Sequence, residues 1–225
     1  MHERPRLVTF DFYTALVDCQ ATIVPALRGA LGETVDAEAL AREWRAKQLE
    51  WAQLSNSLCR GRIPFRECTR LALRHVLARH RIGAGEGEIG TLVAAWDRMR
   101  PWPEAAATLG TIKARGYAIA ILSNGDEAML RSGAAAFDVA FDHIFASEQA
   151  GHYKPHPGMY ALPAMRTGIA GHAVLHVAGS GNDVLGARLA GLRCIWSNRT
   201  GEPPADASVR ADHELRDLTE LLAIL

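Results

Sequence analysis

Short apolar runs that end on polar residues occur once near the start of the chain and repeatedly in its second half, and this order constrains the fold most. The first run covers Leu7 to Phe10 and leads to Asp11, and later runs cover 117–122, 143–146, 174–178 and 194–196. Helical patterns separate the later runs, such as Pro157 to Thr167 with a proline in its first turn. The alternation predicts an α/β fold with a doubly wound parallel sheet and right-handed crossovers.

Residues 17–98 contain no strand-like run, and their apolar residues recur at helical spacing. Examples are Ile23, Val24, Leu27 and Leu31, then Leu40, Trp44, Leu49 and Leu54. We therefore predict an all-helical cap domain over 17–98, inserted into an α/β core domain made of 1–16 and 99–225. A cap placed after the first strand lies above the active edge of the sheet and suits a site that excludes water. The tail, Leu215 to Leu225, is predicted as a final helix.

The composition bounds the partners and the location of the protein. The 225 residues include 25 Lys plus Arg and 25 Asp plus Glu, so the net charge is zero and no basic stripe suggests nucleic acid. No apolar run approaches the length of a membrane span. Four cysteines lack metal-ligand spacing, namely Cys19, Cys59, Cys68 and Cys194. We expect reduced thiols and a cytoplasmic protein that binds neither nucleic acid nor a membrane.

Polar side chains stand at four places where strands of the predicted sheet end. They are Asp11, Ser123 with Asn124, Lys154, and Asp183. In an open α/β sheet, ligands bind beyond the carboxyl ends of the strands, so these groups are expected to converge. Each has an ordinary structural explanation as a turn, a loop residue or a helix cap, and only the ordered set of four indicates a site.

The chemistry of these groups leaves alternatives open. Asp11 can act as a nucleophile, a general base or a metal ligand. A lysine such as Lys154 keeps a neighbouring carboxylate ionised by charge attraction. Ser123 and Asn124 can donate hydrogen bonds to an anion, and Asp183 can orient or deprotonate a water molecule.

The same residues resemble the motifs of the haloacid dehalogenase superfamily over essentially the whole chain. Phe10 to Tyr13 is similar to the first motif, whose aspartate is the nucleophile. Ser123 to Gly125 resembles the second motif, Tyr153 to Pro155 the third, and Gly179 to Asp183 the fourth. Within the predicted cap, Trp44 to Trp51 resembles a helix of the L-2-haloacid dehalogenase (type II) branch, and Asn198 to Gly201 resembles the terminal segment of that branch.

This resemblance implies a hydrolase that cleaves the carbon–halogen bond of short L-2-haloacids and gives 2-hydroxy acids and halide. Asp11 would displace the halide with inversion and form an ester, while Lys154 holds Asp11 anionic. Water positioned by Asp183 and Ser180 would then hydrolyse the ester. The implied substrate and halide contacts are Arg45 and Asn124 for the halide, Ser123 for the carboxylate, Tyr13, Leu49 and Phe65 around the reacting carbon, and Tyr160 beside the site. Since this branch commonly forms homodimers, a homodimer is expected.

Two positions argue against a metal cofactor. Phosphatases of the superfamily hold magnesium between the nucleophile and an acid in the fourth motif, and they use a second acid two residues after the nucleophile. Gly179 and Tyr13 occupy these positions here, and neither supplies a ligand for a hard cation. We therefore expect no cofactor.

Two motifs depart from the pattern of the branch. Thr14-Ala15 replaces the Gly-Thr of the first motif, so the threonine hydroxyl is either missing at Ala15 or moved to Thr14. In the fourth motif, Ala178 and Ser180 replace a serine and an asparagine. Three alternatives therefore stay open: a hydrolase that opens another activated carbon, such as that of a small cyclic imino acid; a magnesium-dependent phosphatase; and a non-catalytic protein that binds an anion or a partner.

Overall fold

A computed structural model of the protein describes residues 4–58 and 60–225, so Cys59 lies outside it. Within these ranges, six parallel strands form one sheet in the order β5-β4-β1-β6-β7-β8. They are β1 (Leu7–Phe10), β4 (Ala118–Ser123), β5 (His143–Ala146), β6 (Val174–Ala178), β7 (Arg193–Ser197) and β8 (His213–Leu215). Leu7 of β1 lies opposite Ala118 and Val174. The predicted doubly wound parallel sheet is confirmed.

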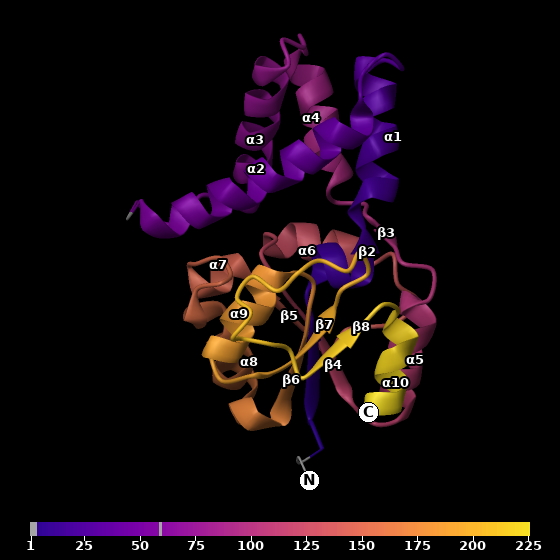
Figure 1. Ribbon diagram of the computed structural model, residues 1–225, viewed down its shortest axis with the longest axis vertical. Coiled ribbons are helices and arrows are strands. Elements are labelled where there is room, and N and C mark those ends of the chain that lie inside the picture. The colour runs from indigo at the N-terminus through magenta and orange to yellow at the C-terminus, as the bar shows by residue number, and fades with distance from the viewer. Residues whose placement is uncertain (1–3, 59) are drawn as a thin grey trace.

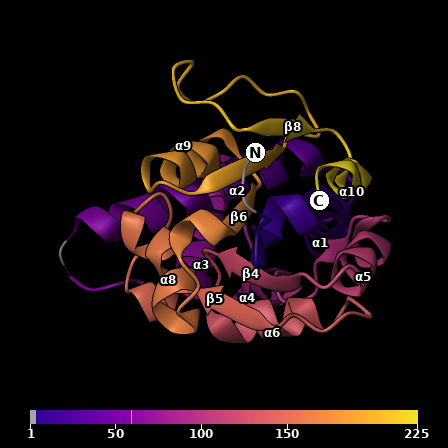
Figure 2. The ribbon, with the colours of Figure 1, turned by 90° about the horizontal axis from the view of Figure 1, so that it is seen from below.

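Helices cover both faces of this sheet because successive side chains of a strand point to opposite faces. Val8 and Phe10 belong to the core formed with α5 (Ala105–Ala114), α6 (Glu127–Ala134) and α10 (Leu221–Ile224). Leu7 belongs to the core on the other face, formed with α8 (Pro157–Thr167) and α9 (Gly181–Leu189). Figure 2 shows α8 and α9 on one side of the strands and α5 and α10 on the other.

Four helices stand together above the carboxyl edge of the sheet (Figure 1). They are α1 (Cys19–Leu31), α2 (Ala37–Ser57), α3 (Phe65–Arg79) and α4 (Glu86–Ala95). The short strand β2 (Val17–Asp18) pairs antiparallel with β3 (Arg100–Pro101), so the chain enters and leaves this helical cap at adjacent points. Apart from the two-residue strand β2, the regular structure in the described residues of the cap is helical, as expected, while the domain boundaries at 16/17 and 98/99 stay a prediction.

The predicted final helix over Leu215 to Leu225 is only partly present, because helical structure covers 218–224 and begins as a 3-10 turn. Leu215 closes the edge strand β8, and a single 3-10 turn, η3 (Leu218–Glu220), precedes the four-residue α10. The Asp217 carboxylate accepts a hydrogen bond from Thr219 N at 2.8 Å and starts that turn. Further short elements are α7 (Ser147–Ala150), a 3-10 turn η2 (Gly171–Ala173) and one π-helical turn η1 (Phe12–Leu16). None of the described helices is long and apolar enough to cross a membrane.

Candidate active site

A small cleft of about 70 Å³ lies between the carboxyl edge of the sheet and the cap. Its wall combines residues at the ends of three strands, β1, β4 and β6, with the loop before α8 and the cap helix α2. Lys154 was expected at a strand end, but it lies in that loop, which α7 separates from β5. The lining residues are Asp11, Tyr13, Thr14, Arg45, Leu49, Gln53, Ser123, Asn124, Lys154, Pro155, Ser180, Asn182 and Asp183. The polar groups that were expected at the strand ends therefore meet in one place.

Asp11 follows β1 directly and continues its ladder, because its N–H donates to Val177 O at 2.9 Å. One carboxylate oxygen, Oδ1, accepts hydrogen bonds from Ser123 Oγ at 3.0 Å and from Lys154 Nζ at 3.3 Å. The other oxygen, Oδ2, has no hydrogen-bond partner among the described residues. The side chain is 13% exposed, so Oδ2 is an oriented anion with free lone pairs facing a small cleft. Such an oxygen is suited to nucleophilic attack.

The space beside Asp11 Oδ2 depends on Gly179. A Cβ atom at position 179 would lie 2.6 Å from Asp11 Oδ2 and 2.8 Å from the Cβ atom of Thr14. These distances are too short for any side chain unless Asp11 or Thr14 moves. Thr14 thus fills the room that a residue at 179 would need. Thr14 itself lines the cleft, whereas Ala15 is fully buried.

Lys154 and Asp183 form a buried ion pair beneath the cleft. Lys154 Nζ lies 2.9 Å from Asp183 Oδ2, and the two side chains are only 6% and 5% exposed. Burial acts to raise the pKa of Asp183, but the Lys154 ammonium and the hydrogen bonds around Asp183 outweigh it and hold that pKa well below its usual range. Asp183 is therefore a carboxylate that holds the Lys154 Nζ atom between the two acids.

Asn124 and Ser180 line the cleft with defined donors. The Asn124 Oδ1 atom accepts a hydrogen bond from Lys154 N at 2.7 Å, which leaves the amide N–H groups of Asn124 for an anion. Ser180 caps α9, because its Oγ atom accepts from Asp183 N at 3.3 Å, and its hydroxyl proton is still free to donate. The Ser123 hydroxyl instead donates to Asp11, so its expected contact with a substrate carboxylate stays a prediction.

Arg45 reaches the cleft from α2 in the cap. Its Nη1 atom donates to Gln48 Oε1 at 2.6 Å, and the fully buried Gln48 in turn donates to Thr69 Oγ1 at 2.6 Å. The guanidinium carbon lies 5.2 Å from the centre of the Tyr13 ring, a distance typical of cation–π contacts. Held in this way, Arg45 presents its remaining N–H donors as a fixed positive charge opposite Asp11.

The aromatic residues of the predicted site occupy different places. Tyr13 lines the cleft and is 1% exposed, and burial raises the pKa of its phenol well above the ordinary value. Phe65 does not line the cleft but packs behind Tyr13, with the ring centres 5.4 Å apart. Tyr160 is also absent from the lining, and its hydroxyl donates to Asp183 Oδ1 at 2.9 Å. Leu49 lines the cleft from the cap, as expected.

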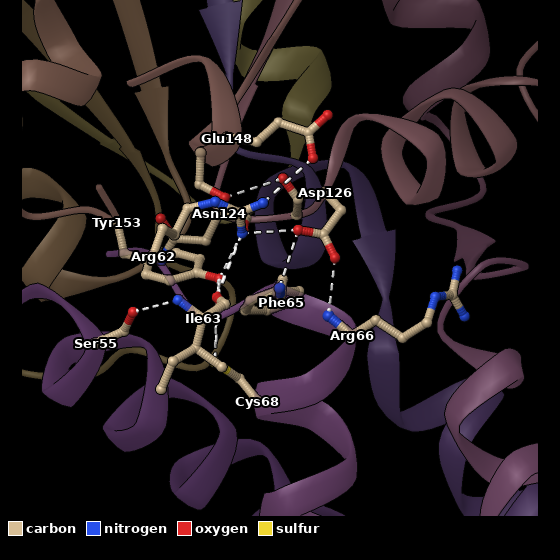
Figure 3. Close-up of polar contacts among 12 residues, drawn as sticks. Ser55, Arg62, Ile63, Phe65, Arg66, Cys68, Asn124, Asp126, Glu148 and Tyr153 are labelled. Carbon is tan, nitrogen blue, oxygen red and sulfur yellow. Dashed lines mark hydrogen bonds and ion pairs between the residues drawn. The ribbon is translucent and has the colours of Figure 1, made fainter. Parts of the chain in front are cut away.

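A polar joint fastens the cap to the core next to the cleft (Figure 3). Arg62, which lies just before α3, donates to Asp126 Oδ1 at 2.8 Å, to Tyr153 Oη at 2.7 Å and to Glu148 Oε2 at 3.2 Å. Asp126 also accepts from the first N–H groups of α3, those of Phe65 and Arg66, both at 2.9 Å. A core residue thus caps a helix of the cap, whose own preceding residue, Pro64, provides no side-chain acceptor.

The joint also fixes the backbone before Lys154. The Asn56 side chain of α2 donates to Tyr153 O and accepts from Tyr153 N, both at 2.9 Å. Because Tyr153 precedes Lys154, residues of the cap help to place the lysine of the core.

Several lining residues were not predicted, namely Thr14 as part of the wall, Gln53, Pro155 and Asn182. His176 was missed as well, although it contacts both Lys154 and Asp183. The only signal for His176 in the sequence is a single polar residue inside the apolar run 174–178, whereas nothing local marks Gln53.

The fold and the cleft define a capped α/β enzyme with a carboxylate at its reactive centre. Residues 5–191 match the family model "haloacid dehalogenase-like hydrolase". The chain is 31% identical to "(S)-2-haloacid dehalogenase 4A" of Burkholderia cepacia, covering 98% of this chain and 94% of the relative.

Solved structures agree with this match. A structure described as "Crystal Structure analysis of a Dehalogenase" superposes with a TM-score of 0.92 at 30% identity, covering 100% of this chain and 99% of the other. The L-2-haloacid dehalogenase from Xanthobacter autotrophicus with chloropropionic acid covalently bound gives a TM-score of 0.88 at 26% identity and 98% coverage of both chains. The chain belongs to the haloacid dehalogenase-like hydrolases, in the L-2-haloacid dehalogenase branch, as the motifs predicted.

Proposed function

We propose that this protein is a hydrolytic dehalogenase that converts short L-2-haloacids into 2-hydroxy acids and halide through an ester on Asp11. The observation that carries the proposal is the arrangement around Asp11, whose Oδ1 atom is held by Ser123 and Lys154 while Oδ2 has no partner within the described part of the chain. The cationic Arg45 of the cap shares the same cleft. A nucleophile and a receptor for the leaving anion therefore line one small cavity.

In the first half-reaction, Asp11 Oδ2 attacks the carbon that bears the halogen. The new C–O bond forms as the carbon–halogen bond breaks, and the negative charge moves from Asp11 to the departing halide. Arg45 and the Asn124 amide stabilise this charge where it develops. Tyr13 and Leu49 shield the reacting carbon from water.

In the second half-reaction, water attacks the Asp11 ester carbonyl. Asp183 and Ser180 are the groups proposed to position this water, and both line the cleft. The bond between the Asp11 carbonyl and the substrate oxygen breaks, which frees the 2-hydroxy acid and restores the carboxylate of Asp11. One proton is released to solvent with each halide.

The bound ligand of one relative supports this route, because the Xanthobacter autotrophicus structure carries covalently bound chloropropionic acid. The crowding at Gly179 weighs against the magnesium phosphatase alternative. Replacement of Gly179 by an acid would place its Cβ atom 2.6 Å from Asp11 Oδ2, so the metal-binding acid of the phosphatases does not fit here without rearrangement. We retain as proposals a homodimer, a cytoplasmic location and the cap boundaries at 17 and 98.

The test is halide release from L-2-chloropropionate with a metal chelator present, with Asp11→Asn as the matched control. We expect release that the chelator does not affect and that the variant loses by at least about 10³-fold. Intact-protein mass spectrometry during turnover should detect the ester on the wild-type chain alone. Absence of halide release from haloacids would refute the proposal and move attention to phosphate esters with magnesium and to small cyclic imino acids.

A further inference from the structure

His176 is a fully buried histidine that no step of the proposed reaction uses. It lies in β6 directly opposite Thr9 of β1, on the face of the sheet covered by α8 and α9. Its Nε2 atom lies 3.1 Å from Asp183 Oδ2 and 3.2 Å from Lys154 Nζ, and its Nδ1 atom lies 2.9 Å from Thr9 Oγ1. Since His176 is not part of the cleft wall, it acts only through its neighbours.

Two groups face the Nε2 atom, the Asp183 carboxylate, which only accepts hydrogen bonds, and the Lys154 ammonium, which only donates them. We assign the proton to Nε2, where it donates to Asp183, because Lys154 already has the carboxylates of Asp11 and Asp183 as acceptors. The Thr9 hydroxyl then donates to the bare Nδ1 atom, since its other acceptor, Leu175 O, lies farther away at 3.5 Å. Thr9 thus holds His176 as a donor toward Asp183.

The hydrogen bonds of Asp183 divide unequally between its two oxygens. Oδ2 accepts from Lys154 Nζ at 2.9 Å, His176 Nε2 at 3.1 Å and Gly179 N at 3.3 Å. Oδ1 accepts from the Tyr160 hydroxyl at 2.9 Å. A carboxylate oxygen has two lone pairs, so Oδ2 is saturated and Oδ1 has one acceptor position left. Asp183 lines the cleft, and the proposal below places one water molecule at this remaining position.

Formation of the ester changes the charges around Asp183. Before the reaction, Lys154 is shared between the carboxylates of Asp11 and Asp183. Once Asp11 is an ester it carries no charge, and Lys154 attracts Asp183 alone. An ammonium is a compact charge without a fixed direction, so it does not by itself keep Asp183 from turning. The donors that stay on Oδ2 are His176 Nε2, which is rigidly placed in the sheet at 3.1 Å, and the more distant Gly179 N at 3.3 Å.

We propose that His176 is a positioning residue for ester hydrolysis, a role that rests on the proposed function. With Thr9 behind it, His176 fixes Oδ2 of Asp183 so that Oδ1 faces the attacking water. That water gives one proton to Asp183 Oδ1 while its oxygen adds to the Asp11 carbonyl carbon. The bond from this carbon to the substrate oxygen then breaks, and the leaving alkoxide takes the proton from Asp183. The acid formed at Asp11 releases the last proton to solvent.

The test separates the two half-reactions in single turnovers with enzyme in excess over L-2-chloropropionate. His176→Phe keeps a planar ring but removes the donor, and His176→Gln restores a donor near the place of Nε2. We expect His176→Phe to release halide at the wild-type rate and to form the hydroxy acid about 10- to 100-fold more slowly, below the full contribution of a general base. The ester should accumulate on His176→Phe in intact-mass spectra, and His176→Gln should recover most of the hydrolysis rate.

A purely structural role predicts other results. Equal slowing of both half-reactions, an unchanged hydrolysis rate, or no recovery in His176→Gln would each overturn the proposal. If His176→Phe fails to fold, Thr9→Val tests the proposal in its place, because it keeps the shape of the strand and removes only the hydroxyl that holds Nδ1. The proposal then requires that the Thr9→Val variant accumulate the ester. Wild-type protein that releases no halide would refute the proposed function itself, which is a distinct outcome.

Discussion

Replacing Asp126 perturbs the joint between cap and core more than any other single change that we consider. Asp126→Ala removes a carboxylate that is 14% exposed, and with it the acceptor for Arg62 and for the N–H groups of Phe65 and Arg66. Loss of a helix cap costs about 1 kcal/mol, and breaking a buried ion pair costs about 3–5 kcal/mol. Arg62 keeps Glu148 and Tyr153 as partners. The low end of the range for a broken ion pair therefore applies, and we expect the free energy of unfolding to fall by about 3 kcal/mol.

Equilibrium unfolding in urea, followed by tryptophan fluorescence and by circular dichroism, measures this loss. Arg62→Ala is the matched variant and should cost about 1–2 kcal/mol, because Asp126 retains its two backbone donors. Arg28→Ala is the control, since Arg28 and Glu38 form an ion pair whose side chains are 40% and 49% exposed. Exposed pairs contribute at most about 1 kcal/mol.

The reasoning would be refuted if Asp126→Ala cost no more than the Arg28 control. It would be refuted in part if Arg62→Ala cost as much as Asp126→Ala, because the two backbone hydrogen bonds of Asp126 would then contribute nothing. Non-coincident fluorescence and circular dichroism transitions would show that the cap separates from the core before the sheet unfolds.

Three further predictions concern the cleft. Gly179→Ser should lower kcat/KM by at least about 10-fold through crowding of Asp11. Adding Thr14→Gly should restore only part of it, because it removes the contact with Thr14 and leaves the shorter one with Asp11. Strict additivity in this double-mutant cycle would contradict the coupling. Gln48→Leu, which frees Arg45, should lower kcat/KM for haloacids by about 10-fold with little loss of stability, and an unchanged value would show that Arg45 needs no anchor. The folded-state pKa of Asp183 lies below its unfolded value of about 3.9, so its stabilising contribution is present above that pH and is lost as the pH falls. Urea unfolding between pH 6 and pH 3 should therefore show a smaller loss for Asp183→Asn than for wild type, and parallel curves would disprove the linkage.

The sheet was predictable from the sequence because apolar runs, breakers and polar strand ends are local features. The helix Pro157–Thr167 and the strand Val174–Ala178 were predicted with the observed bounds. The strand His213–Leu215 was missed, since a three-residue edge strand with an exposed histidine and glutamate carries no apolar run.

Contacts between distant segments were harder to predict. Asp126 caps a helix that begins about sixty positions earlier in the chain, and its own neighbours give no sign of that role. Gln48 looks like a surface residue of a charged helix, yet tertiary packing buries it fully between Arg45 and Thr69. The convergence of Asp11, Lys154 and Asp183 could be predicted because parallel strands bring their ends to one edge, whereas the partners that hold them depend on packing.

The adjacent crossings at β2 and β3 have a consequence for synthesis on the ribosome. The strand β1 is made first, but its neighbours β4 and β6 follow only from residues 118 and 174 onward. The cap helices between Cys19 and Ala95 are complete well before then, and they pack against one another. We therefore expect the cap helices to become ordered on the nascent chain before β1 has neighbouring strands to pair with. The cap would then form before the edge of the sheet that carries the active site.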